Sequence, residues 1–238
     1  MNQTRTRWMG LRTAGITAAG ISLAILLSAV PSLSRRNPNP RIFPPKSHSF
    51  GNTYEEWSVL SWQGVFGTPF DPAACTVGEV GNVLLLTAST GEPAEFFCCV
   101  PTGKSLLFPI ISTAFLCPCD CGPDGAAPNG TIDELTEAAV STIDLFTLLE
   151  VEIDGSPVEG IAAYRFLSPV FFGTAVEGNV FEFFCGNGPY GPAVADGYFL
   201  MLSPLPPGEH EIHIRAGIPE LSVELETTHF ITVVRPSH

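Results

Sequence analysis

Basic residues are scarce in this chain, and most of them lie near its N-terminus. The 238 residues include 11 Lys and Arg against 24 Asp and Glu. From residue 47 onward, 4 basic residues accompany all 24 acidic ones, which gives a formal net charge of −20. A protein that holds a phosphate backbone needs clustered Lys and Arg. The composition therefore excludes nucleic acid as a partner and suits a domain that stays soluble outside the cell.

Familiar catalytic and cofactor motifs are also missing. No Gly-x-Ser-x-Gly nucleophile elbow occurs. Residues 98–105 (CCVPTGKS) end like a phosphate-binding loop, but Cys98 stands where the first glycine is required. We expect Lys104 to pair with a carboxylate instead. His210 and His213 are three apart on an expected strand, so their side chains face opposite sides and do not form a metal pair.

The first 34 residues have the three-part layout of a secretory signal peptide. Three arginines precede an uncharged run, 13–30, that ends in small residues and Pro31. We expect cleavage after Ala29, Ser32 or Ser34 and export through a Sec-type route into an oxidising compartment. The run approaches the roughly 20 residues that span a bilayer, so an uncleaved anchor is the alternative. This segment is the one expected membrane contact.

The rest of the chain divides into a linker and one domain. Residues 35–50 (RRNPNPRIFPPKSHSF) are basic and proline-rich, which predicts an extended linker with local polyproline character. Residues 51–238 have the length of a single domain. The sequence holds 23 Gly, 22 Pro and 17 Phe, so its apolar runs are short and separated by turn residues. This pattern predicts a mostly β fold, a single-domain β-sandwich or jelly-roll with two short helices.

Local signals place several of the elements. Thr53 is followed three residues later by Glu56, and Thr131 by Glu134, which is the spacing of a helix capping box. The second helix is expected over 132–144, after a loop at 117–130. Asp154 and Gly155 predict a hairpin with a type I′ turn. Strands are expected at 80–88, 95–100, 105–113, 148–153, 197–203, 209–215 and 221–234.

Several motifs follow one another in a recognisable order between residues 50 and 234. They are Tyr54–Trp57 (YEEW), Cys99–Pro109 (CVPTGKSLLFP), Ile153–Gly155 (IDG), Tyr164–Phe171 (YRFLSPVF), Ala193–Tyr198 (AVADGY) and Pro204–His210 (PLPPGEH). Together they resemble a family of exported bacterial proteins with C-x-VP-x-GK-x-LFFP, YR-x-x-SP-x-F and A-x-DGY…PLPPG-x-H motifs. The resemblance implies export but no particular activity. This chain departs from the family in its Cys-Pro-Cys-Asp-Cys loop and in a helix reduced to two tryptophans.

Seven cysteines in an exported chain predict disulfides rather than a zinc site, whose ligands usually come as Cys-x₂₋₄-Cys pairs. Soft-metal binding and reduced thiols are the alternatives. An odd number leaves at least one cysteine free, modified or intermolecular. Adjacent Cys98 and Cys99 face opposite sides of a strand, so they have different partners, and the connectivity stays open. The candidates are Cys75, Cys98, Cys99, Cys117, Cys119, Cys121 and Cys185.

A calcium site is a further candidate. Residues 129–134 (NGTIDE) echo the second half of an EF-hand loop, yet Gly125, Ala127 and Thr136 occupy three of the main ligand positions. A turn followed by a helix cap explains the same residues. The candidate calcium ligands are Asp120, Asp124, Asn129 and Asp133. Calcium is thus a second metal, beside a soft metal at the cysteines, that the sequence leaves open.

Carboxylates are the remaining catalytic candidates. Asp196 lies between Ala195 and Gly197 before an expected buried strand, where turn hydrogen bonding competes with an acid–base role. Glu55 or Glu56 would supply the second carboxylate of a hydrolase. Our leading hypothesis is an exported, non-enzymatic structural or ligand-binding module of the cell envelope or extracellular space, with an extracellular ligand or envelope component as partner. The alternatives are a secreted glycan-active hydrolase with paired carboxylates and a calcium-stabilised adhesion-like module.

Overall fold

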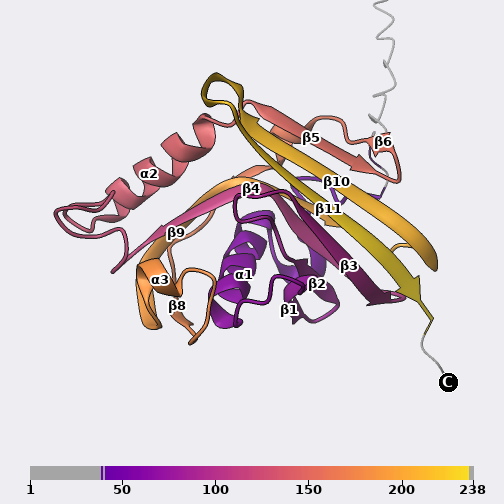
Figure 1. Cartoon of the computed structure of the whole chain (residues 1–238), viewed down its shortest axis with the longest axis horizontal. Coiled ribbons are helices and arrows are strands. Elements are labelled where there is room, and N and C mark those ends of the chain that lie inside the picture. The colour runs from indigo at the N-terminus through magenta and orange to yellow at the C-terminus, as the bar shows by residue number, and fades with distance from the viewer. Residues whose placement is uncertain (1–38, 40, 236–238) are drawn as a thin grey trace, which may run out of the picture. The chain divides into compact units, whose positions relative to one another are not determined.

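The computed structural model describes residue 39 and residues 41–235, which Figure 1 shows as a ribbon. The predicted signal peptide, 1–34, lies outside the described residues. Within the described part, no helix is long and apolar enough to cross a membrane. The described residues form two β-sheets, three α-helices and three short 3-10 helices at Ser49–Gly51, Ile161–Tyr164 and Pro219–Leu221.

The two sheets define the architecture. The first sheet has the order β1-β2-β4-β9-β7, with β8 also paired to β9, and the second has the order β3-β11-β10-β5-β6. The first sheet contains β1 (Thr76–Val80), β2 (Val83–Leu86), β4 (Ser105–Leu116), β7 (Arg165–Leu167), β8 (Phe171–Ala175) and β9 (Gly188–Leu202). The second contains β3 (Ala94–Pro101), β5 (Leu148–Ile153), β6 (Ser156–Pro157), β10 (Gly208–Ile218) and β11 (Val223–Val234).

The sheets pack against each other through alternate side chains. Ile212 and Ile214 of β10 are buried in one cluster with Phe108 of β4 and Leu200 of β9. The residue between the two isoleucines, His213, is only half-buried, as a strand with one buried face requires. The predicted alternation over 209–215 and the predicted mostly β sandwich are therefore confirmed.

Two longer helices cover opposite faces of the first sheet (Figure 1). The helices are α1 (Tyr54–Gly67), α2 (Ile132–Asp144) and the one-turn α3 (Glu182–Cys185). Ala193 and Ala195 of β9 pack with Phe66 of α1, whereas Val194 packs with Leu135 of α2. Because neighbouring side chains of a strand point to opposite faces, β9 is buried on both sides.

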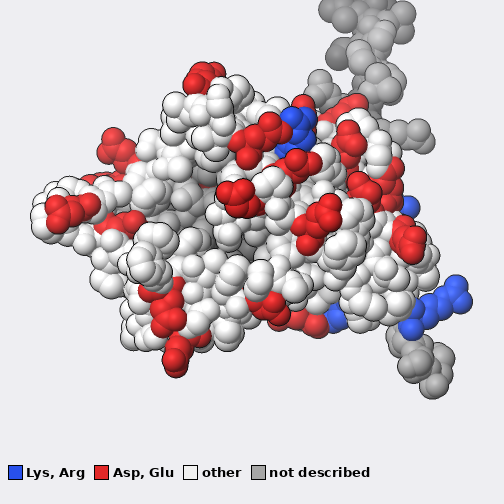
Figure 2. All heavy atoms as spheres, viewed as in Figure 1, with Lys and Arg blue, Asp and Glu red and all other residues white. Residues whose placement is uncertain are grey.

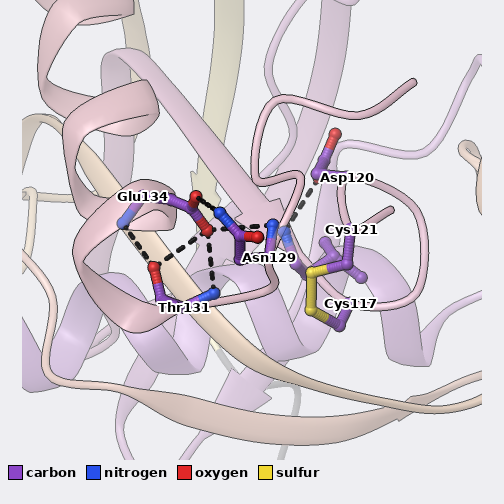
Figure 3. Close-up of a disulfide and its surroundings, with 7 residues drawn as sticks. Cys117, Asp120, Cys121, Asn129, Thr131 and Glu134 are labelled. Atoms are coloured by element: carbon purple, nitrogen blue, oxygen red, sulfur yellow. Dashed lines mark hydrogen bonds between the residues drawn. A yellow bond between two sulfur atoms is a disulfide. The ribbon is translucent and has the colours of Figure 1, made fainter. Parts of the chain in front are cut away.

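Both predicted capping boxes are present. Thr53 accepts a hydrogen bond from the Glu56 N–H at 3.3 Å, and the Glu56 carboxylate accepts one from the Thr53 N–H at 2.8 Å. Thr131 and Glu134 make the same reciprocal pair at the start of α2 (Figure 3). Each box satisfies N–H groups that the first turn of a helix leaves without intrahelical partners.

The predicted hairpin between β5 and β6 is also confirmed. Asp154 and Gly155 have φ angles of 51° and 69°, the left-handed values that a type I′ turn needs. The Asp154 carboxylate lies 2.9 Å from His210 Nδ1 and accepts a hydrogen bond from the Glu211 N–H at 3.0 Å. His213 contacts Glu226 instead, at 2.8 Å. The two histidines thus serve different contacts on opposite sides of β10.

Two strands differ most from the prediction, whereas the others have bounds within three residues of those expected. The single strand expected at 80–88 is a hairpin, in which Val80 of β1 pairs with Val83 of β2 across Gly81 and Asn82. The strand expected at 197–203 begins at Gly188, because β8 pairs with the Gly- and Pro-rich stretch before it. Both errors come from turn-type residues, which end one strand in the first case and lie within a paired strand in the second.

The second half of the predicted linker 35–50 is part of the folded domain. Ile42 is buried and forms a β-bridge with Leu202, and the Phe43 N–H donates to the Met201 carbonyl at 3.0 Å. The Asn39 amide donates to and accepts from the backbone of Glu159, at 2.8 and 3.0 Å. Residues 41–43 therefore pair with the end of β9 rather than forming part of a free tether, because the Ile42 side chain is buried in the core.

One histidine is buried in the sandwich core. His229 of β11 is fully buried and stacks on Phe96, with ring centroids 5.2 Å apart. Its Nε2 atom has no hydrogen-bond partner. Burial lowers the pKa of His229 from 6.5 to about 4, because the low-dielectric core disfavours the charged ring. The native protein therefore keeps this histidine neutral at neutral pH.

This burial predicts a specific loss of stability in acid. Below pH 6.5 the unfolded chain binds a proton at His229, whereas the native protein binds this proton only near pH 4 and below. The free energy of unfolding should therefore fall by about 3 kcal/mol across this range because of this residue alone. Urea unfolding of the native protein and of His229→Gln at pH 4, 5, 6 and 7 measures the difference. His213→Gln is the control, and equal pH slopes for native protein and His229→Gln would contradict the prediction.

Candidate functional site

A cleft of about 740 Å³ opens beside β4. Its floor is the second half of β4, and its walls come from α1, the segments 68–77 and 86–91, α3 and the loop after β4. Ile214, Leu225 and Thr227 of the second sheet close one side. Ligand sites of proteins commonly have volumes of about 300–1,000 Å³, so the cleft is large enough to hold a ligand.

The cleft exists because β4 loses its neighbour halfway along. β2 pairs with only the first three residues of β4, with Val83–Leu85 against Ser105–Leu107. The chain then crosses to the second sheet, where the Ser89 N–H donates to the Thr227 hydroxyl at 3.2 Å. Beyond Leu107, β4 is paired with β9 alone, and its other edge faces the cleft.

Several aromatic residues line the cleft. Trp62 and Phe66 of α1 and Phe181 before α3 form a cluster with ring centroids 5.5 to 6.0 Å apart. Phe184 of α3 is 78% exposed and stands at the rim. The Trp62 indole N–H is buried without a hydrogen-bond partner. The aromatic residues that line the cleft are Trp62, Phe66, Phe70, Phe115, Phe181 and Phe184.

Two acidic residues also line the cleft. Asp71 accepts a hydrogen bond from the Ala73 N–H at 2.9 Å. Asp120, in the loop after β4, accepts one from the Leu116 N–H at 2.8 Å. Burial raises the pKa of the Asp120 carboxyl above its ordinary value. Each carboxylate is held in place by the backbone, so the cleft combines a rigid apolar surface with negative charge.

The rim of the cleft is held by disulfides. Cys119 bonds to Cys185 and so ties the loop after β4 to α3, while Cys117 and Cys121 close that loop on itself (Figure 3). Cys75 bonds to Cys98 between the segment before β1 and the buried face of β3. Cys99 is free and exposed. The predictions of disulfides, of an odd free thiol and of opposite directions for Cys98 and Cys99 are confirmed.

The disulfide at the rim should matter far more for stability than the one within the loop. Cys119 and Cys185 are 66 residues apart, and Cys117 and Cys121 only 4. Loop-closure entropy therefore predicts that replacing both rim cysteines by serine costs about 4 kcal/mol, against about 2 kcal/mol for the loop pair. Urea unfolding of the two double variants tests this. Equal losses would contradict the entropic explanation.

The structure places the metal candidates as follows. In the described part of the chain, one group of three His, Cys, Asp or Glu residues brings its ligand atoms together, namely Cys75, Cys98 and His229. Two of these form a disulfide, which leaves no thiolate for a metal ion. The group is therefore better described as a disulfide beside a neutral histidine than as a metal centre.

The candidate calcium ligands do not form a group in the structure. Asp120 is occupied by the Leu116 N–H, and the Asn129 amide donates to the Glu134 carboxylate at 2.6 Å (Figure 3). Asp124 and Asp133 are exposed. The carboxylates of the three aspartates do not converge within ligand distance of one another. Glu134, which belongs to the helix cap, organises this loop with its hydrogen bonds to Asn129 and Thr131.

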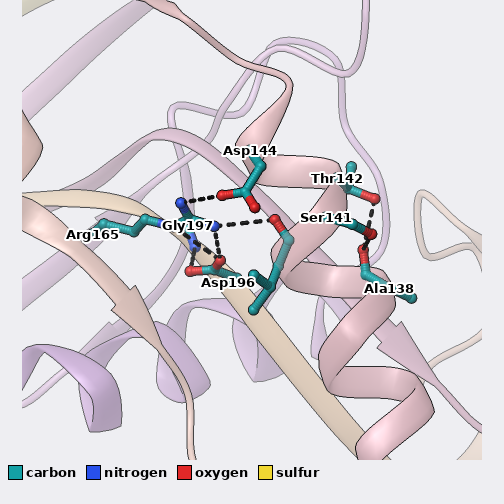
Figure 4. Close-up of polar contacts among 8 residues, drawn as sticks. Ala138, Ser141, Thr142, Asp144, Arg165, Asp196 and Gly197 are labelled. Carbon is teal, nitrogen blue, oxygen red and sulfur yellow. Dashed lines mark hydrogen bonds and ion pairs between the residues drawn. The ribbon is translucent and has the colours of Figure 1, made fainter.

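Asp196 has a different position and role from those expected. It lies in the middle of β9 rather than before a strand, and it is 2% exposed. Its Oδ2 atom accepts hydrogen bonds from Arg165 Nε at 3.0 Å and Nη2 at 2.7 Å (Figure 4). Its carboxylate does not line the cleft, and neither do Glu55 and Glu56.

Arg165 joins Asp196 to the end of α2. Its Nη1 contacts Asp144 at 2.6 Å, and its Nη2 also donates to the Val140 carbonyl at 3.1 Å (Figure 4). These contacts place a positive charge at the C-terminus of α2, where the helix dipole favours it. The hydrogen bond to Asp196, together with the other carboxylate, raises the pKa of Arg165. Asp196 therefore belongs to a structural ion cluster.

Removing the arginine should destabilise the fold strongly. Arg165→Met leaves the buried Asp196 carboxylate without a positively charged partner, with only the Gly197 N–H still donating to it at 2.8 Å, which is expected to cost about 3–5 kcal/mol. The double variant Arg165→Met, Asp196→Leu removes both charges and should recover most of that loss. Urea unfolding of both variants measures the free energies. A loss below 1 kcal/mol in the single variant would show that the pair carries little stability.

Surface ion pairs neutralise other basic residues of the domain. Lys104 pairs with Glu79, which confirms the expected carboxylate partner. Arg215 contacts Glu150 and Glu224, both at 2.6 Å. The face in Figure 2 accordingly shows many acidic side chains and few basic ones.

Comparisons with known proteins add little to this geometry. No protein-family model and no curated protein matches the chain. A solved structure described as "Structure of PbICP-C in complex with falcipain-2" matches at 12% identity, covering 66% of this chain and all of that one. Its TM-score of 0.24 is too low to support an argument about fold or function.

Sequence reasoning missed the cleft. Its aromatic residues come from three separate parts of the chain, 62–70, 115 and 181–184, which only the folded structure brings together. The one available signal was the excess of Phe, 17 residues in a chain with strongly acidic composition.

Proposed function

We propose that the protein is an exported, non-enzymatic binding module of the cell envelope or extracellular space, in the family that its motifs resemble. Its binding site is the aromatic cleft beside β4. The observation that carries the proposal is the gathering of six aromatic residues around one cleft of about 740 Å³. Apolar clefts with a few fixed polar groups are the usual form of ligand sites.

Export is supported by the cysteines. Six of the seven form disulfides, and such bonds persist in oxidising compartments. Two of the disulfides hold the loop at the rim of the cleft, so the site depends on this oxidised state.

Exposed apolar side chains at the rim support binding rather than a purely structural role. Phe184 and Phe70 are 78% and 49% exposed, and both line the cleft. Leaving large aromatic side chains in water forgoes the stabilisation that burial would give. A ligand that covers them recovers it, which is the ordinary reason for an exposed apolar patch.

The carboxylates that the sequence suggests for a hydrolase, Asp196 with Glu55 or Glu56, do not line the cleft. Asp196 is held by Arg165, and Glu56 is held by the helix cap. We therefore assign the cleft to binding and treat hydrolysis as the outcome that would overturn the proposal.

The proposal predicts that apolar ligands bind at the rim through Phe184. An anilinonaphthalene dye should bind the purified exported protein, and Phe184→Ser should weaken that binding at least tenfold because it removes an apolar wall. Phe183→Ser is the matched control, since Phe183 lies beside Phe184 in α3, is 92% exposed and does not line the cleft. Titration of dye fluorescence gives both affinities.

Two results would contradict the proposal. Equal weakening by both serine variants would show that the dye binds exposed aromatics rather than the cleft. Hydrolysis of a glycan panel by the native protein, lost in Asp196→Asn while the fold is retained, would make the protein an enzyme instead.

A further inference from the structure

The hydrogen bonds at the end of β4 show which of its residues direct their backbone groups toward the free edge. Cys117 bonds to β9, its N–H donating to the Pro192 carbonyl at 3.1 Å and its carbonyl accepting from the Gly191 N–H at 2.8 Å. The N–H and carbonyl of Leu116 bond to Asp120 instead, both at 2.8 Å. Backbone groups of successive strand residues point to opposite edges. Leu116 therefore faces the edge away from β9.

By the same alternation, Ser112 and Ala114 also face away from β9. The β9 side agrees, because Ala195, which lies opposite Ala114, bonds to Ser168 on the far edge of β9. β2 does not reach this part of β4. Two N–H and two carbonyl groups thus point into the cleft, and no described residue bonds to them.

The unpaired stretch of the β4 edge, Ser112 and Ala114, which we call the open window, is limited at both ends. At one end, Pro109 has no N–H group, and the pairing of β4 with β9 shifts register between Pro109 and Ile111. At the other end, Asp120 occupies the backbone groups of Leu116. Proteins usually block an exposed strand edge over its whole length to prevent pairing with other chains. In β4 the backbone groups of Ser112 and Ala114 are left unblocked, and both residues line the cleft.

We propose that the cleft binds an extended polypeptide segment of a partner protein, which pairs with β4 as an added strand. This inference rests on the proposed function and specifies its ligand. The two free residues offer four ladder hydrogen bonds, a pattern that another strand satisfies. Alternate side chains of the added strand would enter the aromatic cluster around Trp62 and Phe181.

Charge indicates that the segment is cationic. Asp71 and Asp120 line the cleft, and the chain from residue 47 onward has 24 acidic residues against 4 basic ones. Three of those basic residues, Lys104, Arg165 and Arg215, are already paired with carboxylates. A segment that carries Lys or Arg beside its apolar residues therefore fits the site, and its binding weakens as salt rises.

Backbone-methylated peptides test the pairing directly. The probe is the blocked peptide Lys-Val-Phe-Val-Tyr-Val-Lys, measured by calorimetry against the native exported protein. One comparison peptide is methylated on the nitrogens of its valines, and the other on those of its Phe and Tyr. An added strand bonds through one edge only, so one methylated peptide should bind at least tenfold more weakly and the other like the parent.

A variant of the protein supplies the second arm. Ala114→Pro removes one N–H of the open window without touching the ladder to β9, a place where an edge strand tolerates proline. Peptide affinity should fall at least tenfold, whereas Phe183→Ser, which changes a residue outside the cleft, should leave it unchanged. Hydrogen exchange should also slow at the amides of Ser112 and Ala114 when the parent peptide binds. This readout uses the native protein and stands even if the proline variant does not fold.

Each other outcome overturns the inference in a distinguishable way. If both methylated peptides bind like the parent, the cleft takes apolar side chains without strand pairing, and the proposed function survives. The same holds if the dye binds through Phe184 but the peptide does not bind. If sedimentation shows a dimer that dissociates in the Ala114→Pro variant, the edge of β4 pairs with a second copy of this chain instead. If neither dye nor peptide binds, the proposed function fails as well.

Discussion

The antiparallel ladder between β4 and β9 is the constraint on which the rest of the structure depends. It joins ten residue pairs, from Leu106–Leu202 to Leu116–Ala193. Because the side chains of β9 alternate, this one ladder is covered by α1 on one face and by α2 on the other. The cleft forms where β4 extends beyond β2, so it follows from the strand topology rather than from a gap in the core.

The distribution of charge in the domain is a second constraint on the structure. The few cations of the domain are used locally, with Arg165 neutralising a buried carboxylate and Arg215 joining three neighbouring strands. The remaining surface is acidic, as the face in Figure 2 shows. Like charge keeps copies of the protein apart, which protects an apolar cleft and an open strand edge from self-association. The same charge raises the local concentration of a cationic partner.

Features with a local cause could be predicted from the sequence. The capping boxes at Thr53 and Thr131 and the turn at Asp154 depend on residues at most three positions apart, and all three are present. The role of Asp196 could not be predicted in this way, because its partner Arg165 lies 31 residues away. The hairpin that divides the expected strand at 80–88 also has a local cause, because Gly81 and Asn82 form a two-residue turn between β1 and β2.

The cleft could not be predicted either, because it depends on contacts between residues that are far apart in sequence. Trp62, Phe115 and Phe181 are more than 50 residues apart in sequence, and only the sheet topology brings them to one site. The pairing of the predicted linker with the domain has a related cause, since the proline content of 35–50 gives no sign that Ile42 bridges to Leu202. Extended conformation and independence from the domain are separate properties.

The placement of Cys98 and Cys99 on one strand has a consequence for oxidative folding. A slip of β3 by one residue against β11 would turn Cys99 toward Cys75 and bring Cys98 to the surface. The same slip would expose Phe96 and Val100, which are buried in the core. Hydrophobic burial therefore favours the register in which Cys98, and not Cys99, faces Cys75. The register of β3 against β11 thus determines which of two adjacent cysteines can form the disulfide.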